Sequence, residues 1–426
     1  MMLHSIPPSH WATWGIVAAA TGAVILRPGK WSESVWAVSG ALALILGQLL
    51  PLPAAVHAVG KGLDVYLFLT GMMLVAEVAR REGLFDFMAA WAVRLARGSP
   101  TQLFLWVYGI GVLVTVFMSN DATAIVLTPA VYAAAKKAGA KPLPYLLACA
   151  FVANAASFVL PISNPANLVI FGARMPALMA WISTFALASL TSIVVTFAVL
   201  RWLQRDALAG YIERDLAQPE LSGTGRLAAC GLALMASALL AASALYAPLG
   251  PTTLLTAALV AVVVTLRKRE SPVVLLRGVS WSVLALVGGL FVLAEALVQS
   301  GVVALLGDAV RQAAAVSPDG SAHGLSVLIA VVCNLINNLP AGLLAGLVVT
   351  DAGASNLIRS AVTIGIDLGP NLSVTGSLAT LLWLVAIRRE GENVTAWQFL
   401  RVGALAMPLA LAASLGALYL QQKWWT

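Results

Sequence analysis

The chain has 426 residues, of which 60% are hydrophobic and only 10% are charged. A soluble globular protein averages about 25% charged residues, so this composition excludes an ordinary soluble domain and predicts a polytopic helical membrane protein. The formal net charge is +7. The basic residues cluster in short connections between apolar segments, which is the positive-inside pattern and argues against a nucleic-acid partner.

The apolar segments have the length that membrane-spanning helices need, about 20 residues each. We expect an all-α fold of about 10–12 transmembrane segments, with its boundaries correct to a few residues. The candidate spans are residues 11–26, 33–50, 63–80, 101–118, 143–160, 177–200, 227–246, 252–266, 279–299, 325–338, 372–387 and 398–420.

Charges at the ends of these segments predict their orientation. Residues 227–266 form a predicted hairpin whose two ends are basic and whose tip, residues 247–251, is uncharged. Both ends are therefore expected in the cytoplasm and the tip outside. The helix at 63–80 ends at Arg80 and Arg81, hence inside, whereas the helix at 279–299 follows a basic loop and starts inside.

The two halves of the chain repeat each other in opposite directions. Glu77 and Glu295 lie in similar apolar contexts, and almost the same sequence separation relates Asn120 to Asn337. Asn371 follows Asn167 at a smaller separation, which requires a shortened second half. Inverted-topology repeats of this kind are typical of secondary transporters.

This repeat predicts the domain organisation. We expect N-terminal scaffold helices over residues 1–60 and a first inverted repeat over 61–205. A cytoplasmic connection with its linking hairpin follows over 206–278, and a second inverted repeat over 279–426.

Polar breaks interrupt the apolar runs at two places in each half: residues 119–121 and 163–167 in the first, 337–340 and 367–371 in the second. Proline and glycine at these breaks are hard to continue as helix. Such polar, broken segments are costly in lipid unless they line a cavity. We expect broken helices or re-entrant hairpins whose tips meet near the bilayer midplane and surround a small polar substrate.

The predicted substrate-binding residues are Asn120, Asp121, Thr123, Ser163, Asn164, Asn167, Asn337, Asn338, Asn371 and Thr375. A single asparagine of this kind could instead only join helices together.

Four acidic residues fall in or near the apolar spans, and carboxylates in such positions commonly relay protons. Asp121 is the first candidate for proton coupling and Asp367 the second, because both adjoin a break. Glu77 and Glu295 are further candidates, although an ion pair between Glu77 and the nearby Arg80 explains that residue equally well.

Several of these residues carry a resemblance to a known family. Asn120-Asp121 with Leu127-Thr128-Pro129, then Ser163-Asn164 and Asn337-Asn338-Leu339-Pro340, are similar to segments of the arsenical-pump membrane protein (ArsB) family of the ion transporter superfamily. The most specific likeness is the run from Asp367 to Trp383, and the likeness extends over nearly the whole chain.

The resemblance implies efflux of arsenite or antimonite across a bacterial inner membrane in exchange for protons, with optional coupling to a soluble ATPase subunit. The chain has no phosphate-binding loop of its own, so any use of ATP requires that partner. Arsenite near neutral pH is a small uncharged trihydroxy species, which suits hydrogen-bonding asparagine, serine and threonine side chains.

Other functions remain alternatives. A sodium/proton antiporter or a dicarboxylate transporter could share the same fold. The cysteines Cys149 and Cys333 are interpreted as packing residues, since thiolates would hold arsenic too tightly for release. No cofactor or metal site is expected, and no protease-like motif supports an enzyme.

Overall fold

The computed structural model describes residues 7–172, 175–213 and 220–425, and within these ranges its regular secondary structure is all helical, without strands. Seven described helices are long and apolar enough to cross a membrane, or eight if the pair α3 and α4, bent by 48°, is one span. Three further apolar helices are shorter. The predicted polytopic all-helical class is thus confirmed. The number of helices long enough to cross a membrane is smaller than the 10–12 expected, because several apolar runs form broken or short helices.

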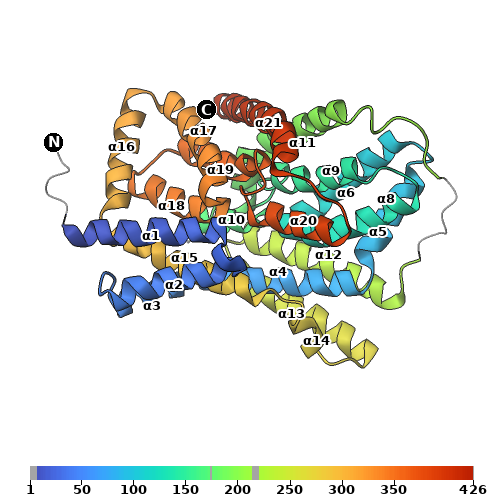
Figure 1. Cartoon of the computed structure of the whole chain (residues 1–426), viewed down its shortest axis with the longest axis horizontal. Coiled ribbons are helices and arrows are strands. Elements are labelled where there is room, and N and C mark those ends of the chain that lie inside the picture. The colour runs from blue at the N-terminus through green and yellow to red at the C-terminus, as the bar shows by residue number, and fades with distance from the viewer. Residues whose placement is uncertain (1–6, 173–174, 214–219, 426) are drawn as a thin grey trace.

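Most helices follow one another with short connections, and a longer connection separates α11 from α12 (Figure 1). In the first half they are α1 (Pro8–Leu26), α2 (Glu33–Leu46), α3 (Leu52–Lys61), α4 (Leu63–Arg81), α5 (Leu84–Leu95), α6 (Pro100–Phe117), α7 (Asn120–Ala122), α8 (Thr128–Lys137), α9 (Leu143–Ala155), α10 (Pro165–Phe171) and α11 (Leu178–Leu203). In the second half they are α12 (Gly223–Ala244), α13 (Leu249–Lys268), α14 (Val273–Leu276), α15 (Trp281–Gln299), α16 (Val302–Val316), α17 (Pro318–Ile336), α18 (Asn338–Asp351), α19 (Asn356–Leu368), α20 (Leu378–Arg389) and α21 (Ala396–Trp425). Short turns join some of them: η2 (Pro28–Lys30), the π turn η3 (Thr123–Leu127), η4 (Pro161–Ser163) and η6 (Gly369–Asn371).

The order of helices in the second half follows that in the first. Each half begins with a hairpin, α1–α2 or α12–α13, and continues with a short helix and then a long one, α4 or α15. Each hairpin packs on the long helix of the other half: α13 lies along α4, and α2 lies along α15. The final helices of the two halves, α11 and α21, also pack together (Figure 1). This order puts a hairpin ahead of each segment that the sequence assigned to a repeat; the repeat boundaries themselves stay a prediction.

Helices α4 and α15 run in opposite directions, as the charges predicted. At the start of α4, Gly62 packs against the ring of Phe291, whereas near its end Glu77 packs against Gly278, just before α15. Asp64 Oδ1 accepts a hydrogen bond from the amide of Gly250 at the α12–α13 tip. At the other end of α4, Lys268 at the end of α13 pairs with Glu82 at 3.0 Å. The uncharged tip and the basic ends of the hairpin therefore lie at opposite ends of α4.

Candidate functional site

The first break separates α6 from α7. Ser119 has φ 143°, which a helix does not allow, and its side chain caps α7 by accepting from the amide of Ala122. The π turn η3 follows, and π turns of this kind are frequent at functional sites. Thr128 Oγ1 donates to the carbonyl of Thr123 at 3.0 Å inside this turn. The Thr123 hydroxyl lies 2.8 Å from that of Thr115, so Thr123 fastens the break to α6.

The second half contains the matching break between α17 and α18. Asn337 has φ 70° and caps α18 by accepting from the amide of Leu339 at 3.3 Å. The sequence separation of Ser119 and Asn337 equals that of Glu77 and Glu295. The repeat inferred from the sequence pairs Asn337 with Asn120 instead. The shared capping role shifts this match by one residue, so that Asn120 corresponds to Asn338.

The next break of the first half lies between α9 and α10. The Ser163 hydroxyl donates to the carbonyl of Val116 at 3.2 Å, which holds η4 against the end of α6. Asn164 Oδ1 caps α10 at the amide of Ala166, at 3.0 Å. Asn167 Nδ2 donates to the carbonyl of Ser157 at 2.9 Å. Each polar side chain at this break therefore makes the bonds that an interrupted backbone leaves open.

The corresponding segment of the second half runs from η6 to α20 and is held by Asn334 of α17. Asn334 Nδ2 donates to the carbonyl of Gly369 at 2.9 Å, and its Oδ1 accepts from the Ser373 hydroxyl at 2.7 Å. Thr375 Oγ1 donates to the carbonyl of Asn334 at 2.9 Å. Asn334 is not among the residues predicted from the sequence, because it lies within an apolar helix shortly before the break.

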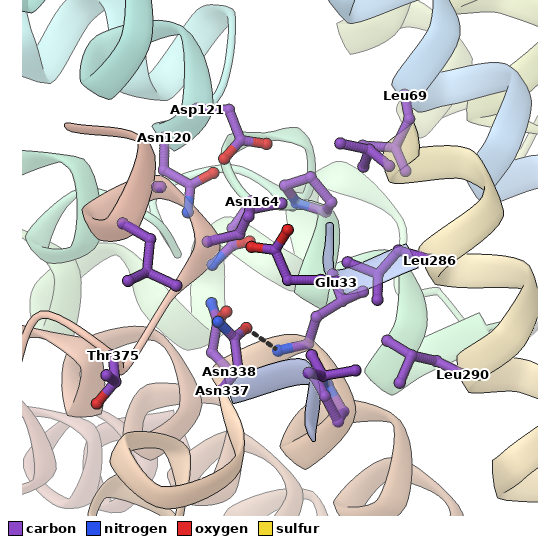
Figure 2. Close-up of a pocket in the computed structure, with 18 residues that line it drawn as sticks. Glu33, Leu69, Asn120, Asp121, Asn164, Leu286, Leu290, Asn337, Asn338 and Thr375 are labelled. Carbon is purple, nitrogen blue, oxygen red and sulfur yellow. Dashed lines mark hydrogen bonds between the residues drawn. The ribbon is translucent and has the colours of Figure 1, made fainter. Parts of the chain in front are cut away.

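The breaks meet at a central cavity (Figure 2). Six of the ten predicted binding residues line it: Asn120, Asp121, Asn164, Asn337, Asn338 and Thr375. Figure 2 shows the polar side chains of the two halves facing each other, while Leu69 of α4 and Leu286 and Leu290 of α15 close one side. The other four predicted residues, Thr123, Ser163, Asn167 and Asn371, are fully buried and do not line this cavity.

Glu33, which is not among the predicted site residues, also lines the cavity (Figure 2). It begins α2 and forms an ion pair with Arg27 across the tip of the first hairpin. In the sequence it follows a basic loop and resembles an ordinary residue at a span end. Only the packing of α2 against α15 brings it to the site.

The four candidate carboxylates have different surroundings. Asp121 faces the cavity. Asp367 is completely buried behind it; its Oδ1 accepts from Asn164 Nδ2 at 2.6 Å, and its Oδ2 has no hydrogen-bond partner. Glu77 is held by Arg80 through two bonds of 2.8 and 2.7 Å. Glu295 pairs at 2.9 Å with Lys61, a partner from a distant part of the sequence.

A buried cluster around Asn154 joins the halves. Asn154 Nδ2 donates to Asn371 Oδ1 at 3.0 Å, and Asn371 Nδ2 donates to the carbonyl of Phe151 at 3.1 Å. Ser377 and Thr380 complete the cluster. The repeat inferred from the sequence pairs Asn371 with Asn167 and leaves Asn154 out. Asn154 precedes Asn371 by nearly the same separation as relates Glu77 to Glu295, so this constant offset was the signal for it.

The side chains that line the cavity offer mainly hydrogen-bonding groups, together with two carboxylates. The residues that line it include four asparagines, one threonine and two carboxylates, Asp121 and Glu33, and no lysine or arginine. Cys149 and Cys333 are buried and do not line it. Among the residues that the structure describes, no three His, Cys, Asp or Glu side chains are grouped to hold a metal ion.

Comparisons with known proteins agree with a transporter. A family model described as "Citrate transporter" (CitMHS) matches residues 21–370. An uncharacterized transporter of Mycobacterium tuberculosis is 26% identical over 417 residues, covering 93% of this chain and 95% of that protein. The arsenical pump membrane proteins of Yersinia enterocolitica and Escherichia coli K12 are 26% and 25% identical over 407 residues, covering 92% of this chain and 93% of each relative.

The fold resembles a solved structure. The crystal structure of the Alcanivorax borkumensis YdaH transporter, described as having an unusual topology, superposes with a TM-score of 0.55 and 17% sequence identity. The superposition covers 98% of both chains.

Proposed function

The chain belongs to the citrate transporter (CitMHS) family of membrane transporters, and from this premise we propose that it exports arsenite or antimonite from the bacterial cytoplasm in exchange for protons. The cargo follows from two lines of support: relatives that are named arsenical pump membrane proteins, and the chemistry of the central cavity. Localisation in the bacterial inner membrane, and optional use of a soluble ATPase subunit, belong to the same proposal.

The observation that carries the proposal is the charge of the cavity. Its polar groups are carboxamides, a hydroxyl and carboxylates, without a basic side chain among the residues that line it. A neutral trihydroxy solute donates and accepts hydrogen bonds, and asparagine does both. Desolvating a citrate or dicarboxylate anion here would require cationic partners that the lining lacks, so a dicarboxylate cargo is not favoured.

A sodium ion is the other alternative, since carboxamide and carboxylate oxygens also suit a hard cation. No observation on the site favours it over the arsenical cargo. Sodium/proton exchange measured in everted membrane vesicles that carry this protein separates the two cargoes.

We assign the proton-coupled group to Asp121 first and Asp367 second. Asp121 lies in the cavity, where its charge state can respond to the cargo. Asp367 has a single hydrogen bond and one oxygen without a partner, and a buried ionised carboxylate is costly in that position. Asp367 therefore suits a neutral carboxyl in this conformation and a proton carrier only if the segment around it rearranges. Glu77 and Glu295 are secondary candidates, because each is held in an ion pair.

The broken segments of the two halves are proposed to move as one body. Buried hydrogen bonds cross between them at Asn164–Asp367, Asn154–Asn371 and from Trp383 to the carbonyl of Leu146. The cavity wall on α4 and α15 is made of leucine and valine side chains instead. Apolar contacts have no directional bonds to break, so movement along that wall has the lower barrier.

Arsenite uptake into everted membrane vesicles, with and without an imposed proton gradient, tests the proposal. We expect gradient-dependent accumulation that antimonite competes with. If the vesicles exchange sodium or a dicarboxylate for protons but do not accumulate arsenite, the protein is a transporter and the proposed arsenical cargo is wrong. Accumulation that ignores the gradient would keep the cargo and overturn the coupling.

A further inference from the structure

A second and larger cavity adjoins the central one. The two cavities share Leu69, Asp121, Pro165, Val283 and Leu378 in their linings. From this shared wall the second cavity continues past Ala76 and Ile125 and ends among charged residues: Glu77, Arg80, Asp86, Arg389 and Glu390. Asp121 is the polar side chain common to both linings, so it stands at their junction.

The charged end of this second cavity lies at helix ends that carry cytoplasmic signals. Helix α4 ends with Arg80 and Arg81, and α20 ends with Arg388 and Arg389. Helix α8, which contributes Pro129 and Ala130 to the wall, ends with Lys136 and Lys137. Basic residues flanking several spans at one end mark the cytoplasmic side.

We infer that the central site opens to the cytoplasm through this second cavity, hereafter the vestibule, and that Asp121 exchanges protons and meets cargo there. The opening toward the cytoplasm is argued from the cavity and the basic helix ends alone, whereas the cargo, the direction of transport and the proton exchange at Asp121 rest on the proposed function. An exporter has to load from the cytoplasm, so the conformation described here is the loading state.

The rim of the vestibule has no preference for anions. It holds two arginines, Arg80 and Arg389, and three carboxylates, Glu77, Asp86 and Glu390. Arg80 is already engaged by both oxygens of Glu77. The rim therefore has a formal charge of about −1, which admits neutral or cationic solutes and does not attract a multivalent anion.

Gly278 packs closely against the Glu77 side chain of the Glu77–Arg80 pair. A Cβ at this position would overlap the carboxyl group of Glu77, so glycine permits the close approach of the turn before α15 to α4. The pair thus lies where α4 and the turn before α15 border the vestibule.

Cysteine labelling tests the vestibule directly. Ile125, in the π turn, lines the vestibule and is 37% exposed, so Ile125→Cys should react with a membrane-impermeant maleimide in everted vesicles and not in intact cells. Leu245→Cys, at the tip of the α12–α13 hairpin and 78% exposed, is the matched control and should react only in intact cells. Both are made in a Cys230→Ser background, because Cys230 is the exposed native cysteine among the three.

Labelling of Ile125→Cys from the outer side only, or its failure to react in everted vesicles while Leu245→Cys behaves as expected, would overturn the inference. The experiment contains no arsenite, so its outcome is independent of the cargo. If Ile125→Cys is labelled from the cytoplasmic side but the protein accumulates no arsenite in the vesicle assay, the proposed function is contradicted and the vestibule is not.

Discussion

The two halves of the molecule have matching backbones and different charges. Ser119 and Asn337 both interrupt a helix and cap the next one, at the same sequence separation that relates Glu77 to Glu295. At that separation, the position equivalent to Asp121 is Leu339, and the position equivalent to Asp367 is Cys149. Neither Asp121 nor Asp367 therefore has a carboxylate counterpart in the other half.

The site therefore has two kinds of component: backbone breaks and asparagines that occur in both halves, and carboxylates that occur in only one half. The repeated breaks provide free backbone groups and asparagine side chains on both sides of the cavity. The unmatched carboxylates have different surroundings: Asp121 of the first half faces the cavity and the vestibule, while Asp367 of the second half is enclosed and bonded to Asn164. The symmetric parts can form a binding site, whereas the asymmetric parts can respond to protons.

Asp121→Asn tests the asymmetry with the largest expected effect. The amide keeps the shape and removes the titratable group, so gradient-driven arsenite accumulation should fall roughly tenfold or more, equivalent to about 1.4 kcal/mol, while counterflow without a gradient persists. Vesicle uptake measures both. Asp86→Asn, on the rim, is the matched control and should retain most of the gradient dependence. Unchanged gradient-driven uptake in Asp121→Asn would assign the coupling elsewhere.

Asn164→Ala breaks the bond between the halves that supports Asp367. The Asp367 carboxyl would lose its one hydrogen-bond donor, and an unsatisfied buried polar group costs about 1–3 kcal/mol. We expect a lower unfolding temperature in detergent together with weaker transport. Adding Asp367→Leu should restore part of the stability, because an apolar side chain leaves no polar group without a partner at this position. An unfolding temperature of Asn164→Ala equal to that of the wild type would show that the bond does not contribute to stability.

Asn154→Ala and Asn167→Ala compare a bond across the halves with a bond within one half. Asn154 reaches Asn371 of the second half, whereas Asn167 bonds to Ser157 of its own half. Each loss should cost about 0.6–2 kcal/mol of stability. If the breaks move as one body, Asn154→Ala should also slow transport at equal protein level. Equal transport rates in the two variants, normalised to folded protein, would contradict that proposal.

Removal of the buried thiols should have the smallest effect. Cys149 occupies the position equivalent to Asp367, and Cys333 lies on α17; neither lines the cavity. The double variant Cys149→Ala, Cys333→Ala should keep arsenite resistance in growth assays. Loss of resistance with normal protein in the membrane would revive a thiol ligand for the arsenical.

The sequence by itself determined the membrane class, the positions of the breaks and the orientation of the repeats. These follow from local properties: the length of apolar runs, proline and asparagine within them, and basic residues at their ends. The same reasoning selected six residues that line the cavity, since polar groups at a break in a membrane helix require a cavity or a partner.

Only the tertiary structure decided which polar groups face the cavity and which satisfy one another. Asn371 looked like a substrate ligand and is instead bonded to Asn154, while Glu33 looked like a span end and lines the site. Lys61 neutralises Glu295 from a distant part of the chain. Hydrogen bonds and ion pairs of this kind depend on how helices pack across the two halves, and no local pattern in the sequence contains that information.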